Sequence, residues 1–157
     1  MDDAAVRAIV GTLRDRRDPS PLVPTGIREA ALDDRIAALD APPAVRSALH
    51  LWNDSLERCH AIAQEIGDVD GSYLHGLMHR REPDYGNARY WFRRVGRHPV
   101  FPELGPAADG DPFAMIDLCE KAAVDPALER KLRRVQAREL ELLTAYLLKS
   151  RLPAAGG

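Results

Sequence analysis

The amino-acid sequence predicts an all-α protein, an irregular single-domain bundle of about six or seven helices. Three observations lead to this prediction. Apolar residues recur every three or four positions through most of the 157-residue chain, as they do along the buried face of an amphipathic helix. Clusters rich in proline, glycine and aspartate separate these stretches, and such clusters interrupt helices. No stretch of convincing length alternates polar and apolar residues as a strand does, and no internal repeat is present.

Residues 1–40 are expected to form the N-terminal helices. One helix is predicted over residues 4–16, whose apolar side chains share a face, and a second over residues 27–39. Three prolines and a glycine lie between them, in residues 19–26. Because proline lacks a backbone donor and disfavours helical geometry in the residue before it, this segment is predicted to be an extended connector.

Residues 41–101 form the central segment, in which one long amphipathic helix is predicted over residues 44–66. Beside its apolar stripe runs a polar ridge of four residues: Asn53, Glu57, His60 and Gln64. Residues three or four apart are neighbours on a helix surface. The ridge is therefore expected to lie at the edge of the core, where a pocket can open.

Two shorter helices are predicted to follow, over residues 73–81 and 83–95. Asp70 or Ser72 can cap the first of them. A proline falls near the first turn of the second, and Gly96 is expected to end it. The two short helices are expected to form a bent pair.

Residues 111–152 form the C-terminal part of the predicted domain. Two Asp-Pro pairs, at 111–112 and 125–126, are expected to open its two helices, because proline is favoured at the first helical position. The last helix is predicted to reach about residue 152, and residues 153–157 are expected to fray.

Composition narrows the class of protein. Charged residues make up 29% of the chain and hydrophobic residues 45%, with a net charge of −2, which favours neither disorder nor a basic nucleic-acid binder. Cys59 and Cys119 lie in apolar helical patterns and are predicted to be reduced core thiols. The chain opens on Met1-Asp2-Asp3 without an apolar run, and nothing resembles a membrane span. We therefore expect a soluble, cytoplasmic protein.

Four of the five histidines lie between Trp52 and Phe101. His75 and His79 are one helical turn apart and share a face. His60 lies about as far before the predicted turn as His75 lies after it, counting about 1.5 Å per residue. An antiparallel hairpin would therefore bring His60, His75 and His79 level with one another.

Glu57, one turn before His60, would add a carboxylate to these three histidines. Such a set can bind a divalent metal ion and leave a position open for catalysis. The pattern is not the zincin motif, because Gly76 stands where that motif has its glutamate, and it is not ferritin-like, because only one Glu-x-x-His pair is present. Three interpretations stay open: a catalytic metal site, a metal-free polar pocket, and a structural network.

Arginines are concentrated in the same region: Arg80, Arg81, Arg89, Arg93, Arg94 and Arg97. Guanidinium groups, with Asn87 and Tyr90 nearby, suit a carboxylate or phosphate ligand. The alternative is a structural network in which Arg80 or Arg81 pairs with Asp84. A nucleic-acid partner is disfavoured, because the aromatic residues here fit a buried helix face better than an exposed stacking platform.

The residues from His75 to Pro99 carry a longer pattern, HGxxHRREPDxxNAxYWFRRVGxHP. With its surroundings, from about residue 49 to residue 101, this pattern resembles the signature of an uncharacterised family of small bacterial and fungal proteins. The resemblance implies membership of a family, but it brings no reaction, cofactor or catalytic residue with it.

The leading hypothesis is a small-molecule enzyme or ligand-binding protein whose pocket takes an anionic metabolite. The residues expected to move protons are His60, His75, His79 and Asp84. The residues expected to bind the ligand are Arg80, Asn87, Tyr90, Arg94 and His98, the last from a loop where it could instead cap a helix. The alternative is a non-catalytic helical interaction module in which the same residues form a buried polar network. The substrate, the reaction and the oligomeric state are beyond the sequence.

Overall fold

A computed structural model describes residues 1–105 and 108–151, which contain helices and no strand. The helices are α1 (Asp3–Arg14), α2 (Ala30–Ala37), α3 (Pro43–Trp52), α4 (Leu56–Ala63), α5 (Val69–Arg81), α6 (Tyr85–Val95), the short 3₁₀ helix η1 (Phe101–Glu103), α7 (Pro112–Ala122) and α8 (Pro126–Arg151). The predicted all-helical bundle is confirmed, with eight α-helices in these residues instead of about six or seven.

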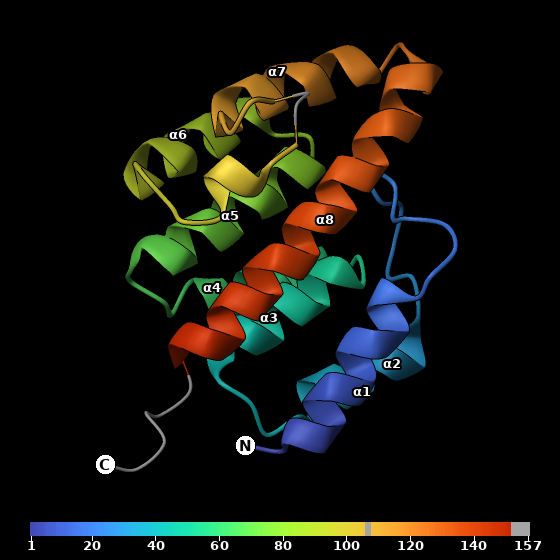
Figure 1. Cartoon of the computed structure of the whole chain (residues 1–157), viewed down its shortest axis with the longest axis vertical. Coiled ribbons are helices and arrows are strands. Elements are labelled where there is room, and N and C mark those ends of the chain that lie inside the picture. The colour runs from blue at the N-terminus through green and yellow to red at the C-terminus, as the bar shows by residue number, and fades with distance from the viewer. Residues whose placement is uncertain (106–107, 152–157) are drawn as a thin grey trace.

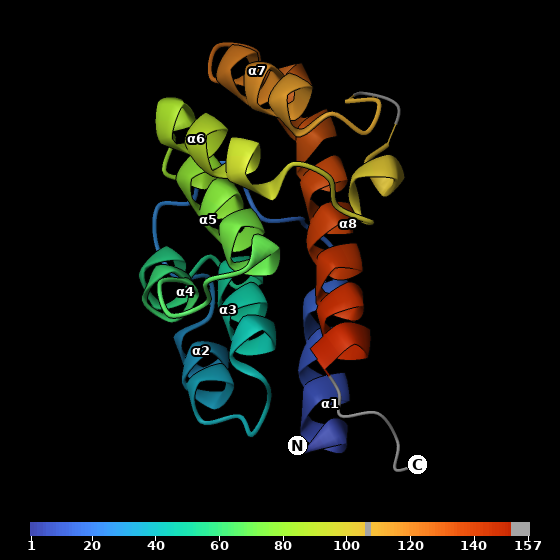
Figure 2. The same ribbon diagram turned by 90° about the vertical axis from the view of Figure 1, so that its left-hand side faces the viewer.

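The longest helix, α8, runs through most of the length of the molecule, with α1 beside its lower half (Figure 1). In the view turned by 90°, the helices α2 to α6 lie in a second layer beside α8, and α7 crosses the upper end of the molecule (Figure 2). Contacts between α3 and α8 join the two layers, and α7 packs against both α6 and α8. None of the described helices combines the length and the apolar composition needed to cross a membrane.

The helix α5 lies inside the protein along nearly its whole length. Every residue from Asp70 to Arg81 is buried, between α3, α4 and α6. Apolar residues such as Leu74 and Leu77 belong to the main hydrophobic core, but most of the polar side chains of α5 are buried too. Because a buried polar group needs a hydrogen-bond partner inside the protein, α5 determines where many of the polar contacts of this fold lie.

Aspartate side chains cap several of these helices. Asp2, Asp68, Asp84 and Asp111 each accept a hydrogen bond from a backbone N–H in the first turn of α1, α5, α6 and α7, respectively. A cap of this kind satisfies an N–H that has no partner within its helix. Asp68, and not the predicted Asp70 or Ser72, caps α5, so that this helix begins at Val69 and not at residue 73.

The predicted single helix over residues 44–66 is wrong, because the structure divides it into α3 and α4. Asp54 has a φ of 64°, in the left-handed region that ends a helix. The N–H of Ser55 donates to the carbonyl of His50 at 2.8 Å, which closes the turn. Asn, Asp and Ser compete with helical hydrogen bonds through their own side chains, and all three occur in succession here. The apolar spacing continues across the break because both helices pack on the same core.

The predicted polar ridge does not survive this break. Asn53 is buried at the end of α3, where it accepts a hydrogen bond from Arg16 and donates to the carbonyl of Glu29. Glu57 and Gln64 are exposed.

The other boundaries differ in smaller ways. The helix α2 begins at Ala30 and not at residue 27, and α6 begins at Tyr85. The helix α8 extends to Arg151. Its predicted end at residue 152 and the predicted fraying of residues 153–157 lie outside the described residues.

Candidate functional site

The hairpin of α4 and α5 brings three histidines together: His60 from α4 and His75 and His79 from α5. One possible ligand atom from each of the three lies within 4.8 Å of the others. The ring centroids are 5.1 Å apart for His60 and His75, 5.8 Å for His60 and His79, and 6.0 Å for His75 and His79. The three imidazoles therefore converge, as the level positions of these residues in a hairpin predict.

His75 lies deepest in this cluster. Its imidazole stacks on the indole of Trp91 from α6, with ring centroids 4.0 Å apart and an interplanar angle of 9°. Its Nδ1 is buried and has no hydrogen-bond partner among the described residues. Burial, reinforced by the neighbouring imidazoles of His60 and His79, lowers the pKa of His75 to about 4. His75 is therefore neutral at pH 7, and one of its ring nitrogens carries a free lone pair.

His79 lies one turn further along α5 and is also neutral. Burial lowers its pKa, although the charges of Glu82 and Asp84 act in the opposite direction. Its Nδ1 lies 3.4 Å from the side-chain nitrogen of Asn87 and 3.6 Å from a carboxylate oxygen of Glu82. Because Nδ1 faces these two residues, Nε2 is the nitrogen that is left for another partner.

One face of α6 borders the cluster. Asn87, Tyr90, Trp91 and Arg94 follow one another at intervals of three, one and three residues, which places them on one side of the helix. The guanidinium of Arg94 lies 5.4 Å from the ring centroid of Trp91 and 5.9 Å from that of Tyr90. Arg94 and Tyr90 are exposed. The α6 rim, defined as these four residues, therefore connects the cluster to the surface.

Asp84 joins α5 to α6. Its carboxylate caps α6 by accepting from the N–H of Asn87 at 3.3 Å, and its own N–H donates to the carbonyl of His79 at 2.8 Å. The side chain is exposed. Its proton-transfer role stays a prediction, while its structural role as a cap is visible.

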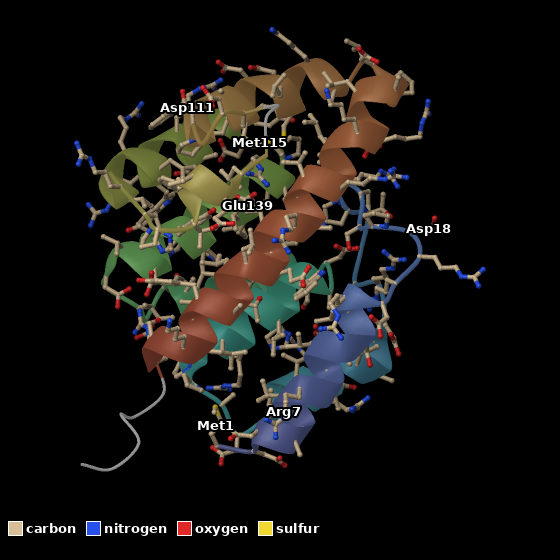
Figure 3. The ribbon with its side chains drawn as sticks, in the orientation of Figure 1. Met1, Arg7, Asp18, Asp111, Met115 and Glu139 are labelled. Atoms are coloured by element: carbon tan, nitrogen blue, oxygen red, sulfur yellow. The ribbon has the colours of Figure 1, made fainter. Side chains whose placement is uncertain are left out.

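Arg80 faces away from solvent and is held by α8. It is 1% exposed and donates to Glu139 at 2.8 Å, and the hydroxyl of Tyr73 donates to the same carboxylate at 2.7 Å. Glu139 lies near the centre of the molecule (Figure 3). Burial opposes the charge of Arg80, but Glu139 outweighs it and raises the pKa. This internal pairing differs from the expected role of Arg80 in binding an external ligand.

Arg81 is also internal. It donates to the carboxylate of Asp54 and to the backbone carbonyls of Leu51, Leu22 and Pro21. The pairing of Arg80 or Arg81 with Asp84, which the structural alternative assumed, is therefore wrong. The partners of Arg81 come from the last turn of α3, from the α3–α4 turn and from the connector after α1, and all of these segments precede α5 in the sequence.

His98 is buried on the other side of α5. Its Nε2 donates to Asp70 at 2.9 Å and its Nδ1 accepts from the N–H of Val100 at 3.2 Å. Its ring packs edge-on against Tyr73 and Tyr146. His98 also lines a surface hollow, together with residues between Gly96 and Phe113, but none of the three clustered histidines does so. The structure thus separates His98 from the other predicted site residues.

Glu57, the predicted carboxylate ligand, is exposed in the first turn of α4 and does not belong to the group that converges. Cys59 is buried in the core, where burial raises the pKa of its thiol to about 12. The predicted position of Cys59 in the core is confirmed, and the raised pKa keeps its thiol neutral at pH 7. Among the described residues, the possible metal ligands that come together here are the three imidazoles.

Gly76 allows α6 to approach this closely. A Cβ at this position would lie 2.6 Å from a ring carbon of Phe92, which is closer than side chains pack. The absence of a side chain on α5 thus lets the aromatic residues of α6 reach the histidines.

Sequence reasoning missed a second buried polar group. Asp33 accepts from His50 at 2.8 Å and from Ser55 at 2.9 Å, and Asn53 lies 3.3 Å away. His50 stands between two leucines in the sequence, which is a signal for burial, but nothing marks Asp33 as its partner. Glu139 was missed for the same reason, because nothing in the sequence of α8 marks it as the partner of Arg80 and Tyr73.

Comparisons of the chain with protein families, with curated proteins and with solved structures gave no match. The function is therefore inferred from the geometry of the site.

Proposed function

We propose that this protein is a small-molecule enzyme or ligand-binding protein whose site consists of the His60, His75 and His79 cluster and the α6 rim. The proposed ligand is an anionic metabolite with a carboxylate or phosphate group. The observation that supports this most is the convergence of three imidazoles, within 4.8 Å, beside a rim that carries an exposed arginine.

The histidine cluster and the α6 rim supply complementary chemistry. Neutral imidazoles can accept a proton or a hydrogen bond, and the lowered pKa values of His75 and His79 keep both neutral at pH 7. Arg94 supplies a fixed positive charge with a planar array of donors, which suits carboxylates and phosphates. His79 is better suited than His75 to proton transfer, because a group with a pKa of about 4 is a weak base at neutral pH.

We also propose a cytoplasmic location. Cys59 and Cys119 are both free and buried, which suits a reducing compartment.

The proposal is tested with the metal-free protein, by following chemical shifts and thermal stability while inorganic phosphate or a small dicarboxylate is added. The variants are His79→Ala and Arg94→Ala, and the matched control is Arg93→Ala, which changes an exposed arginine next to the rim. We expect both site variants to lose anion binding and to melt within a few degrees of the parent. Arg94 is exposed, and surface changes cost about 0.5 kcal/mol or less. His79 is buried, but its polar side-chain contacts are long, at 3.4 and 3.6 Å, so that little is lost with them. The control should keep it. Equal binding by all four proteins would contradict the proposal.

The second candidate is a non-catalytic helical interaction module. It is favoured by the internal ion pairs of α5, because Arg80 and Arg81 are both 1% exposed and paired with Glu139 and Asp54. Under this reading the histidines are part of the same buried network. His79→Ala would then unfold the protein or lower its melting temperature strongly, and no anion would bind to the parent.

A further inference from the structure

The five histidines of this chain fall into two groups: His50 and His98, which have structural roles, and the clustered His60, His75 and His79. His50 and His98, which lie outside the cluster, each have a carboxylate within hydrogen-bond distance, at 2.8 and 2.9 Å. These contacts satisfy and orient a buried imidazole.

No carboxylate of the described residues lies as close to the three clustered histidines, the nearest being that of Glu82 at 3.6 Å from His79. Within the part of the chain that the structure describes, Nδ1 of His75 is buried with no hydrogen-bond partner, and the polar side-chain contacts of His79 are long, at 3.4 and 3.6 Å. An imidazole nitrogen that is buried without a partner is uncommon, because it gives up hydrogen bonds to water and gains none. The three rings instead face one another.

We propose that His60, His75 and His79 together bind one divalent first-row transition metal ion, such as zinc, each through one ring nitrogen. This inference rests on the proposed function in placing the site at the same cluster. Three imidazoles form a known kind of zinc-binding set in which the fourth position is free for water or for another ligand. Imidazole also suits copper, nickel and iron, whereas magnesium and calcium prefer oxygen.

The three imidazoles need to move only slightly to bind one metal ion. Zinc–nitrogen bonds of about 2.0–2.1 Å place the nitrogens of a tetrahedral site about 3.3 Å apart, and the three possible ligand atoms already lie within 4.8 Å of one another. Ring rotations can close most of this difference. Trp91 holds the plane of His75 by stacking at 4.0 Å, so the adjustment falls mainly on His60, which is half-buried.

Glu82 is the outer partner in this arrangement. A metal-bound histidine usually donates its second N–H to a carboxylate, a carbonyl or water, which orients the ring and increases its basicity. The carboxylate of Glu82 lies 3.6 Å from Nδ1 of His79. Asn87, at 3.4 Å, can take the same role through its side-chain oxygen, because the two ends of an amide differ little in shape. Both contacts leave Nε2 of His79 for the metal.

The α6 rim borders the fourth coordination position of the proposed metal ion. Arg94 is exposed beside Trp91 and can hold the far end of an anion that binds the metal. A metal with three imidazole ligands and a nearby guanidinium would bind a phosphate or carboxylate at two points, which deepens the proposed function without requiring a particular reaction.

The experiment uses the full chain after treatment with a chelator. Zinc is added in a calorimeter, and cobalt(II) is added in a spectrophotometer, where tetrahedral coordination gives intense visible absorption. We expect one ion per chain. His60→Ala, His75→Ala and His79→Ala should each abolish the cobalt spectrum. Glu82→Gln should weaken zinc binding by about 10–100-fold, as expected for an outer partner.

The control is His98→Gln, which removes a histidine that lies outside the cluster. It should bind zinc as the parent does, provided that circular dichroism shows it to be folded. A second measurement needs no variant: the ring-nitrogen resonances of the histidines in the ¹⁵N-labelled parent. One equivalent of zinc should shift those of His60, His75 and His79 and leave those of His50 and His98 in place.

Absence of stoichiometric uptake by the parent, or zinc-dependent shifts only in His50 or His98, would overturn the metal site. Phosphate binding by the chelator-treated protein that requires Arg94, without metal uptake, would reject the metal and keep the proposed function. Metal uptake without binding of any anion would support the metal site and reject the anionic ligand.

Discussion

The imidazole of His75 lies flat on the indole of Trp91, with 4.0 Å between the ring centroids and 9° between the ring planes. This contact joins α5 to α6 at the centre of the candidate site. It also makes Trp91 an optical reporter of the protonation of His75, because an imidazolium ring quenches the fluorescence of an adjacent indole.

The first prediction concerns that reporter. In chelator-treated protein, the fluorescence of Trp91 should fall on acidification with a midpoint near pH 4, because burial and the two other imidazoles hold the pKa of His75 at about 4. Trp91→Phe should remove this response, leaving the signal of Trp52. A midpoint near pH 6.5, the ordinary value for histidine, would contradict the assigned burial and packing of His75.

The same shift has a consequence for stability. Between pH 6.5 and pH 4 the unfolded chain protonates His75 and the folded protein does not, so the unfolded state binds more protons and the free energy of unfolding decreases as the pH falls. Urea denaturation at pH 7, 6 and 5 should show this decrease, and His75→Gln should show less of it.

The second prediction compares two glycines. Gly76→Ala places a methyl group 2.6 Å from a ring carbon of Phe92 and should cost about 1–3 kcal/mol through overpacking. Gly86→Ala, in α6, places a methyl group that meets no described atom within 4 Å outside its own stretch of helix. It should be neutral or stabilising by up to about 1 kcal/mol through helix propensity. Denaturant midpoints measure both. Equal effects would mean that α5 and α6 are not in close contact at Gly76.

The third prediction concerns the internal charge of Arg81. Asp54→Asn should cost about 3–5 kcal/mol, because it leaves a buried guanidinium without its counter-ion. The backbone does not explain such a loss, since asparagine tolerates the positive φ of 64° at this position. Asp40→Asn is the control: its carboxylate pairs with the N-terminus but is 82% exposed, and it should cost about 0.5 kcal/mol or less.

The fourth prediction concerns Asp70. Burial raises the pKa of its carboxyl, but hydrogen bonds from His98 and Arg151 outweigh burial, and the pKa is lowered overall. A carboxylate with a lowered pKa stabilises the folded state above its unfolded value, about pH 3.9, and this contribution disappears as the pH falls through the folded value. Acid unfolding of the parent should therefore steepen below about pH 4.

Asp70→Asn is the matched variant for that measurement. It keeps the shape of the side chain and removes its titration, so its stability should depend less on pH in the same acid range. An unchanged acid profile would show that the contacts of Asp70 with His98 and Arg151 contribute little to the stability of the protein.

Much of the helical architecture could be predicted from the spacing of apolar residues, because the buried face of an amphipathic helix is visible in its sequence as apolar residues every three or four positions. The period could not reveal the break at Asp54. Leu49 before it and Cys59 after it point into the same core, so the spacing continues even though the helix does not. The signal that was present, three polar turn-forming residues in succession at 53–55, is weaker than the apolar pattern around it.

The meeting of His60, His75 and His79 was within reach of the sequence, since it depends only on two helices, a short turn and a known rise per residue. The residues that surround the cluster could not be predicted from the sequence. Trp91 could have packed into the core like Phe92, and its stacking on His75 depends on the distance between α5 and α6, which the missing side chain of Gly76 permits.

The sequence by itself determined that the chain is helical, where most of its helices lie, and that three histidines meet on one hairpin, because these properties follow from local spacing. Only the tertiary structure decided which charges are internal and what they contact. Arg80 and Arg81 are adjacent in the sequence, yet they pair with Glu139 and Asp54. Adjacent residues on a helix point about 100° apart, so two different neighbouring segments supply the partners of these arginines. The sequence around an arginine does not indicate which of those segments will cover it.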